Sequence, residues 1–342
     1  MKKPWHIWIF LFLASWSSSL VAAHLVGGEI SYKCVGNNQY RIRMVVYRDC
    51  ASSGAPFDNP AIITIYDGNQ GFVDNRQVFI SSQRQLPVTA PNSCSSLPPF
   101  VCTSKAIYID TVSLPPNNSG YVISHQRCCR NRTIDNIPVP DTYGNTFTTS
   151  IPANDNACNS SPEFTNDPPV ALCRGVPLQE DLSATDADGD SLVYSLCQAY
   201  SGGGRSPNPG PNSPRPDTAQ PPPYPTIPFL NNFSATNPVT ANPSFSINPN
   251  TGILTGRPTA VGQYVFVICV TDYRNGQAQS TVRRDFQFNV TSACTGPSAV
   301  ILGPQIDSSS ICSGRTVTFQ QASLNTGSFL WDFGVANTQA DT

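Results

Sequence analysis

Three aspartates stand within five residues, in the stretch Asp186-Ala187-Asp188-Gly189-Asp190. Calcium binds roughly six to eight oxygen atoms in proteins, and carboxylates this close together repel one another unless a cation or water offsets their charge. The stretch is not an EF-hand, because glycine stands fourth rather than sixth and Cys197 occupies the twelfth position. It predicts either a site for one calcium ion or an Asp/Gly turn whose carboxylates accept hydrogen bonds from backbone amides.

Cysteine is the other residue type that stands out in this chain of 342 residues, which contains 12 cysteines and three histidines. All of the cysteines follow residue 23, and their even number is typical of disulfide bonds in an exported protein. A zinc site is not expected, because no C-x-x-C pair occurs and only His24 and His125 follow residue 23. Structural disulfides are therefore the predicted role of these cysteines.

The spacing of the cysteines predicts part of the pairing. Cys128 and Cys129 are adjacent, so on an extended strand they would point to opposite faces and need different partners, such as Cys34 and Cys50. The loop lengths and the parity of the count around residue 160 predict two more pairs: Cys94 with Cys102, and Cys158 with Cys173. Two further candidates have no assigned partner: Cys197 and Cys269.

Catalytic side chains are scarce in this sequence. His125 stands beside Gln126 on a predicted strand, where a structural role is favoured over Ser-His-Asp chemistry. No H-E-x-x-H motif, G-x-S-x-G motif or glycine-rich phosphate loop occurs. We therefore expect that the protein is not an enzyme.

Sugar binding is the main alternative function. Three of the four tryptophans lie within the first 23 residues, so stacking on sugar rings would depend on Tyr200, Tyr224 and Tyr273. The remaining tryptophan, Trp331, lies in a W-D-F-G context that favours a core position. The alternative prediction is a carbohydrate-binding module, or accessory modules of a secreted polysaccharide-degrading enzyme.

The composition indicates short strands rather than helices. Charged residues make up 12% of the chain, and 32 prolines and 23 glycines disfavour long helices. The net charge of −2 gives no basic footprint for nucleic acid or for an anionic membrane. Clusters of turn residues separate the apolar runs at a spacing typical of all-β sandwiches. The predicted strands are two within 29–48, then 61–66, 77–81, 105–112, 120–127, 146–151, 170–178, 191–196, 244–248, 252–255, 263–271, 280–290 and 316–320.

The N-terminal segment predicts export. Met1-Lys2-Lys3 is followed by an apolar run and by Val21-Ala22-Ala23, which is the pattern of a secretory signal peptide over residues 1–23. The apolar run is short for a bilayer span, so no membrane insertion is expected after cleavage. Composition shifts then predict three units: a β-sandwich over 24–157, a second over 158–293 with a Pro/Gly-rich surface insertion at 198–243, and an incomplete unit over 294–342.

Three motifs in the second unit resemble a cadherin-like repeat. They are SATDADGDSLVYSL at 183–196, FSINPNTGIL at 245–254 and GQYVFVICVTD at 262–272. The resemblance implies an immunoglobulin-like sandwich in which Asp186, Asp188 and Asp190 lie near Asp272, with a further ligand such as Asp155 in the preceding linker. That linker aligns equally well at 154–156 or at 159–162. The Leu-Asp-Arg-Glu motif of the family is replaced by residues 257–260, so a principal glutamate ligand is missing.

Two other segments resemble parts of large exported proteins. Trp331-Asp332-Phe333-Gly334 resembles the core motif of PKD domains, and HLVGGEISY at 24–32 resembles the start of long secreted surface proteins of Bacteroidota. Such proteins carry cadherin-like units, PKD repeats and sorting domains associated with gliding motility. The resemblance therefore implies a non-catalytic cell-surface module for adhesion, matrix assembly or gliding-type motility. It also implies stiffening by calcium and a partner that is an unknown surface protein or polysaccharide.

Overall fold

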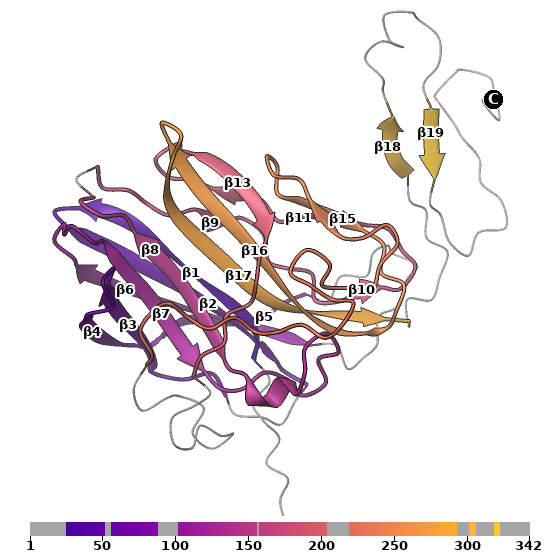
Figure 1. Ribbon diagram of the computed structural model, residues 1–342, viewed down its shortest axis with the longest axis horizontal. Helices are drawn as coiled ribbons and strands as arrows, with labels where there is room; N and C mark the ends of the chain where they lie inside the picture. Colours follow the sequence, from indigo (N-terminus) through magenta and orange to yellow (C-terminus); the bar gives the residue numbers. More distant parts are fainter. Residues whose placement is uncertain are drawn as a thin grey trace, which may run out of the picture.

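The computed structural model is all-β, as the sequence predicts (Figure 1). The structure describes residues 25–51, 56–87, 102–155, 157–203, 219–292, 301–305 and 318–321. Within these ranges the only helical element is the short 3-10 turn η1, Pro140–Thr142. The immunoglobulin-like and cadherin-like names for the sandwiches stay predictions.

The largest sheet contains eight strands in the order β13-β16-β17-β1-β2-β6-β5, with β10 parallel to the end of β17. Long strands of alternating or continuous apolar residues form its centre, as expected for β-branched and aromatic sequences. Its strands are β1 (Leu25–Gly36), β2 (Gln39–Asp49), β5 (Ile80–Gln85), β6 (Thr103–Ser113), β10 (Leu172–Cys173), β13 (Ser191–Leu196), β16 (Gly262–Arg274) and β17 (Gln277–Thr291).

A four-stranded sheet in the order β4-β3-β7-β8 packs against one half of this large sheet. Its strands are β3 (Ala61–Asp67), β4 (Phe72–Val78), β7 (Tyr121–Arg127) and β8 (Asn145–Ile151). Fully buried side chains between the two sheets include Ile42 and Met44 of β2 and Ile63 and Ile65 of β3. These layers form the sandwich predicted for the first unit.

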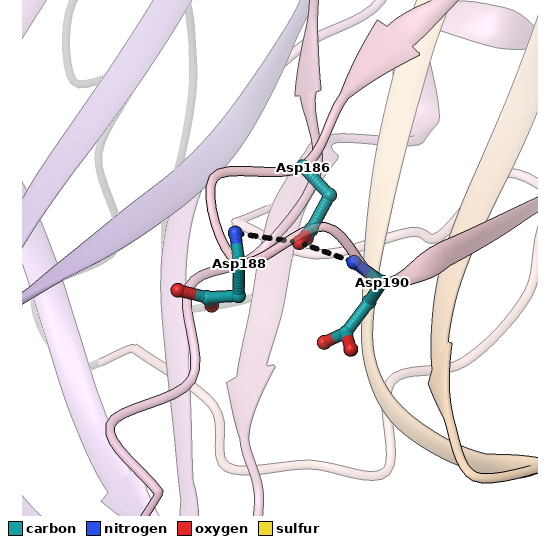
Figure 2. A group of neighbouring side chains, drawn as sticks. All are labelled: Asp186, Asp188 and Asp190. Carbon is teal, nitrogen blue, oxygen red and sulfur yellow. Dashed lines mark hydrogen bonds between the residues drawn. The ribbon is translucent and has the colours of Figure 1, made fainter.

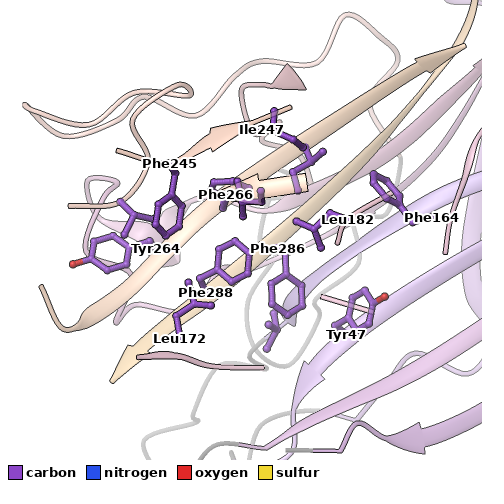
Figure 3. Packing of buried hydrophobic residues seen from close by; sticks show 14 of the residues in the cluster. Tyr47, Phe164, Leu172, Leu182, Phe245, Ile247, Tyr264, Phe266, Phe286 and Phe288 are labelled. Atoms are coloured by element: carbon purple, nitrogen blue, oxygen red, sulfur yellow. The ribbon is translucent and has the colours of Figure 1, made fainter. Parts of the chain in front are cut away.

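Three small sheets complete the described fold. They are β9 (Glu163–Phe164) with β12 (Ala184–Thr185), β11 (Leu178–Asp181) with β15 (Ile253–Gly256) and β14 (Ser246–Ile247), and β18 (Ile301–Gln305) with β19 (Thr318–Gln321). An aromatic core lies under the second of them, where Phe266 and Phe288 meet edge to face with ring centroids 4.9 Å apart (Figure 3). The predicted W-D-F-G core of the third unit lies outside the described residues.

One sheet crosses the unit boundary predicted near residue 158. β1 from the first unit pairs with β17 from the second, with Gly27 opposite Phe286 and Gly28 opposite Asp285. The glycines allow this contact, because a Cβ atom on Gly27 would lie 2.2 Å from the carbonyl oxygen of Asp285. The core of the second unit accordingly includes Val26, Val45 and Tyr47 from the first. The two units therefore share the large sheet and the aromatic core of the second unit.

Two predicted strands are wrong in their extent. Residues 77–81 cover the exposed Phe79, where the chain leaves β4 in one sheet and enters β5 in the other. Residues 170–178 are divided into β10 and β11 by a turn at Gly175, whose φ of +79° favours glycine. In both cases the predicted strand spans a change of direction of the chain.

The Pro/Gly-rich stretch predicted as a surface insertion is partly buried. Among its described residues, Tyr224, Ile227 and Val239 are less than a tenth exposed. Ile227 lies fully buried in a third apolar cluster with Val265 and Val267 of β16. Isolated apolar residues between prolines therefore cover the outer face of the large sheet, which a compositional argument does not detect.

The disulfides correct the predicted pairing. The structure pairs Cys34 with Cys158, Cys50 with Cys102, Cys128 with Cys129, and Cys197 with Cys269. The predicted pairs Cys158 with Cys173 and Cys94 with Cys102 are wrong, and Cys94 itself lies outside the described residues. Separate partners for Cys128 and Cys129 are also wrong.

The register of β2 with β6 and the end of β7 explain two of these corrected pairings. β2 and β6 place Asp49 opposite Thr103, and the amide of Cys50 donates to the carbonyl of Cys102, which brings these cysteines together. Cys128 and Cys129 follow the end of β7 at Arg127, so strand alternation does not separate their side chains.

Candidate metal centre

The loop between β12 and β13 gathers the three aspartates predicted from the sequence (Figure 2). One carboxylate oxygen from each of Asp186, Asp188 and Asp190 lies within 4.8 Å of the others. Oδ1 of Asp186 accepts hydrogen bonds from the backbone amides of Asp188 at 2.9 Å and Asp190 at 3.0 Å. Gly189 has a φ of +81°, a conformation that glycine adopts at no steric cost. The loop is therefore an Asp/Gly turn that also clusters carboxylates.

Arg274, the last residue of β16, neutralises one of these aspartates. Its Nε and Nη2 atoms donate to the two oxygens of Asp190 at 2.9 and 2.7 Å, a bidentate pair. The Asp190 side chain is 7% exposed, and Nη2 also lies 3.6 Å from Oδ2 of Asp188. Asp190 is thus committed to the guanidinium group.

Asp272 and Asp155 lie outside the group of three but are connected to it. Asp272 is fully buried, and its Oδ1 accepts from the amide and hydroxyl of Ser280. Asp155 accepts from the Tyr40 hydroxyl at 2.8 Å and from the backbone amide of Asn159. Asn159 joins the two, because its Nδ2 donates to Oδ2 of Asp272 at 3.0 Å.

The segment from Asp155 to Ser161 holds this network against β1. The amide of Ser161 donates to the Tyr32 carbonyl at 2.9 Å, and the amide of Tyr32 donates to the Ser161 hydroxyl at 2.8 Å. The amide of Ser160 donates to Oδ2 of Asp188 at 2.6 Å. The acidic loop is therefore docked on a segment that the Cys34–Cys158 disulfide ties to β1.

Two buried acceptor oxygens in this network have no hydrogen-bond partner among the described residues. They are Oδ2 of Asp186 and Oδ1 of Asn159, and the Asn159 side chain is fully buried. Burial raises the pKa of Asp186, the amides of Asp190 and Asp188 lower it, and the nearby charges of Asp272 and Asp190 raise it further. Unpaired buried acceptors are unfavourable, and a hard cation is a natural partner for them.

The charge balance of the described residues also fits a cation. Five carboxylates belong to the network: Asp155, Asp186, Asp188, Asp190 and Asp272. Among the described basic side chains, only that of Arg274 pairs with any of them. Oδ2 of Asp186 and Oδ1 of Asn159 are the oxygens best suited to hold calcium, whereas both oxygens of Asp272 already accept hydrogen bonds. The sequence indicates Asn159 only through the alternative linker alignment at 159–162. Nothing in the sequence predicts that its side chain is buried.

Three of the residues considered for other functions, His125, Tyr200 and Tyr224, have structural contacts. His125 is 3% exposed, its Nδ1 lies 2.8 Å from the Ile62 carbonyl, and its ring stacks on Phe147. Tyr224 is 8% exposed, and Arg283 covers the ring of Tyr200 at 3.9 Å. Neither of these two tyrosines offers the open face that stacking on a sugar requires.

Comparison with models of known protein families and with curated proteins gives no match for this chain. The resemblances to cadherin-like and PKD repeats therefore rest on the motifs quoted above and stay predictions. In the ranges that the structure describes, no helix is both long and apolar enough to cross a membrane.

Proposed function

We propose that this chain is a non-catalytic module of an exported cell-surface protein, serving adhesion, matrix assembly or gliding-type motility, and that calcium stiffens it at the acidic loop. The observation that carries the calcium assignment is the pair of buried, unpartnered oxygens on Asp186 and Asn159 beside an excess of carboxylates. A calcium ion would supply the positive charge that this network lacks.

The stiffening follows from the elements that the ligands belong to. Asp186 stands before β13, and Asn159 belongs to the segment tied to β1 and donates to Asp272 near the end of β16. A shared ion would restrain these three parts of the chain relative to one another. Asp188 supports the same arrangement through the Ser160 amide, and Arg274 keeps Asp190 in place.

A mechanical role is supported by the way the two halves are joined. The eight-stranded sheet runs through both halves, and the buried Arg284 of β17 pairs with the buried Glu29 of β1. Export is supported by the signal-like residues 1–23 and by the disulfides. A rigid, disulfide-linked body suits a protein that holds a distal surface away from the cell.

Calcium titration by calorimetry on the full chain tests the proposal. The full chain is needed, because β17 of the second unit pairs with β1 of the first. We expect a dissociation constant of about 10⁻⁴–10⁻³ M, as for extracellular modules. At 100 times that constant, calcium should raise the free energy of unfolding by about 2.7 kcal/mol.

Two variants separate the site from nonspecific effects. Asp186→Asn should abolish both the heat of binding and the stabilisation. Asp181→Asn is the matched control, because Asp181 is an exposed carboxylate that caps the amide of Ser183, and it should bind calcium as the unaltered chain does. Absence of heat and of stabilisation in the unaltered chain would refute the calcium assignment and leave the loop as a turn.

A further inference from the structure

A cavity of about 520 Å³ opens beside the end of β5. Its walls come from β5, from β10 and the residues around it, and from β11. Most of the lining is aliphatic or proline, including Leu86, Pro168, Val170, Pro177 and Pro258. The volume lies within the roughly 300–1,000 Å³ typical of ligand sites, and the prolines fix the backbone of the walls.

Glu180 is the unusual residue of this lining. It stands on β11 two residues after Leu178, on the same face of the strand, and Leu178 packs against the hydrophobic core. Glu180 is partly buried, and burial raises the pKa of its carboxyl. In the described part of the chain no hydrogen bond or ion pair reaches this carboxylate. Its oxygens are not buried atoms, so a cationic group inside the cavity can reach them.

The other charged groups of the cavity are already paired. Asp167 accepts a hydrogen bond from Arg84 at 2.6 Å, another from Lys105, and a third from the Tyr47 hydroxyl at 3.1 Å. Burial opposes the charge of Asp167, but these donors hold the pKa of its carboxyl below the usual value. Among the described lining residues, Glu180 is thus the one charged side chain with no hydrogen bond or ion pair.

We propose that this cavity binds a basic side chain of an extended peptide, with the cationic group on Glu180 and the aliphatic stem along the proline and aliphatic walls. The charge complements Glu180, and the walls suit the apolar stem of lysine or arginine. An extended peptide fits the position, because the cavity borders β5, the terminal strand of the large sheet in the described fold. This site would give the module a polypeptide partner.

Calorimetric titration of the full chain with three probes tests the assignment. The probes are Ac-Ala-Lys-Ala-NH2, the same tripeptide with norleucine in place of lysine, and n-butylamine as a free amine. All titrations contain EDTA, so that the calcium site plays no part. We expect the lysine peptide to bind at least 10-fold more tightly than either of the other probes.

Glu180→Gln should reduce the affinity for the lysine peptide to that of the norleucine peptide. The variant is expected to fold, because it replaces an unpaired, partly buried charge with a neutral group of the same shape, and its melting temperature checks this. Asp181→Asn alters the neighbouring carboxylate on the opposite, exposed face and should bind the lysine peptide unchanged. Equal binding of the lysine and norleucine peptides, or full affinity in Glu180→Gln, would overturn the proposal. Butylamine binding as tightly as the lysine peptide would overturn the assignment to a polypeptide.

Discussion

Negative charge is buried in two different ways in this molecule. In the large sheet, Glu29 is 3% exposed and accepts from Nε and Nη2 of Arg284, which also donates to the Asn166 carbonyl at 2.7 Å. Asp285, the next residue along, is paired in the same bidentate way with Arg130. In the acidic loop, by contrast, several carboxylates share the single guanidinium group of Arg274.

The difference shows which buried charges serve the fold and which are available for a ligand. Glu29 and Asp285 each have their own arginine, and both arginines donate further hydrogen bonds, so each pair is complete without anything from outside. The loop has excess negative charge and leaves Oδ2 of Asp186 without a partner. Replacing the arginine should therefore leave the stabilisation by calcium unchanged in the sheet and increase it in the loop.

Arg284→Met should give the largest effect. It leaves Glu29 buried without a cation, which lowers the free energy of unfolding by about 3–5 kcal/mol. Urea denaturation followed by fluorescence measures this change, and calcium should not restore the loss. The double variant Glu29→Gln/Arg284→Met should recover part of it, because no unpaired carboxylate remains. A double variant no more stable than the single one would show that lost packing, rather than the unpaired charge, dominates.

Arg274→Met should have a smaller effect that calcium reverses. In EDTA we expect a loss of about 1–2 kcal/mol, because Asp190 loses a bidentate partner that is itself partly exposed. In millimolar calcium the variant should gain more stability than the unaltered chain, since less positive charge competes with the ion. Thermal unfolding with and without calcium measures both the loss of stability in EDTA and the gain on adding calcium. An identical calcium shift in the two proteins would mean that Arg274 and the ion do not share the same charges.

The sequence predicted the strands and the acidic loop better than it predicted their assembly. The alternation in β2 and the spacing of Asp186, Asp188 and Asp190 are local signals, and the structure contains the corresponding hairpin and turn. The joining of β1 to β17 depends on the close approach that Gly27 allows, which only the distant strand reveals.

The disulfides illustrate the same limit. Cys158 pairs with Cys34, across 124 residues, because the segment that follows it binds along β1 through Ser160 and Ser161. Arguments from loop length and from the parity of the cysteine count favour pairs that are close in sequence, and they do not predict a contact over this distance. Burial of Asn159 follows from the same docking, so its place beside Asp272 could not be read from the aspartate spacing.

Glu180→Gln should have the smallest effect on stability, and the effect should depend on pH. Burial raises the folded-state pKa of Glu180 above its unfolded value, so the folded state favours the protonated carboxyl. The stability that this group contributes is therefore fully present below about pH 4 and is lost as the pH rises through the raised pKa. Glutamine stays neutral at every pH, so the variant should match the unaltered chain near pH 3.5 and exceed it by about 0.5 kcal/mol near pH 7.5. Urea denaturation of both proteins across this range measures the difference, and Asp181→Asn should not reproduce it. A difference that does not change with pH would mean that the Glu180 carboxylate is solvated like an exposed one, which would also remove its reason to bind a cationic side chain.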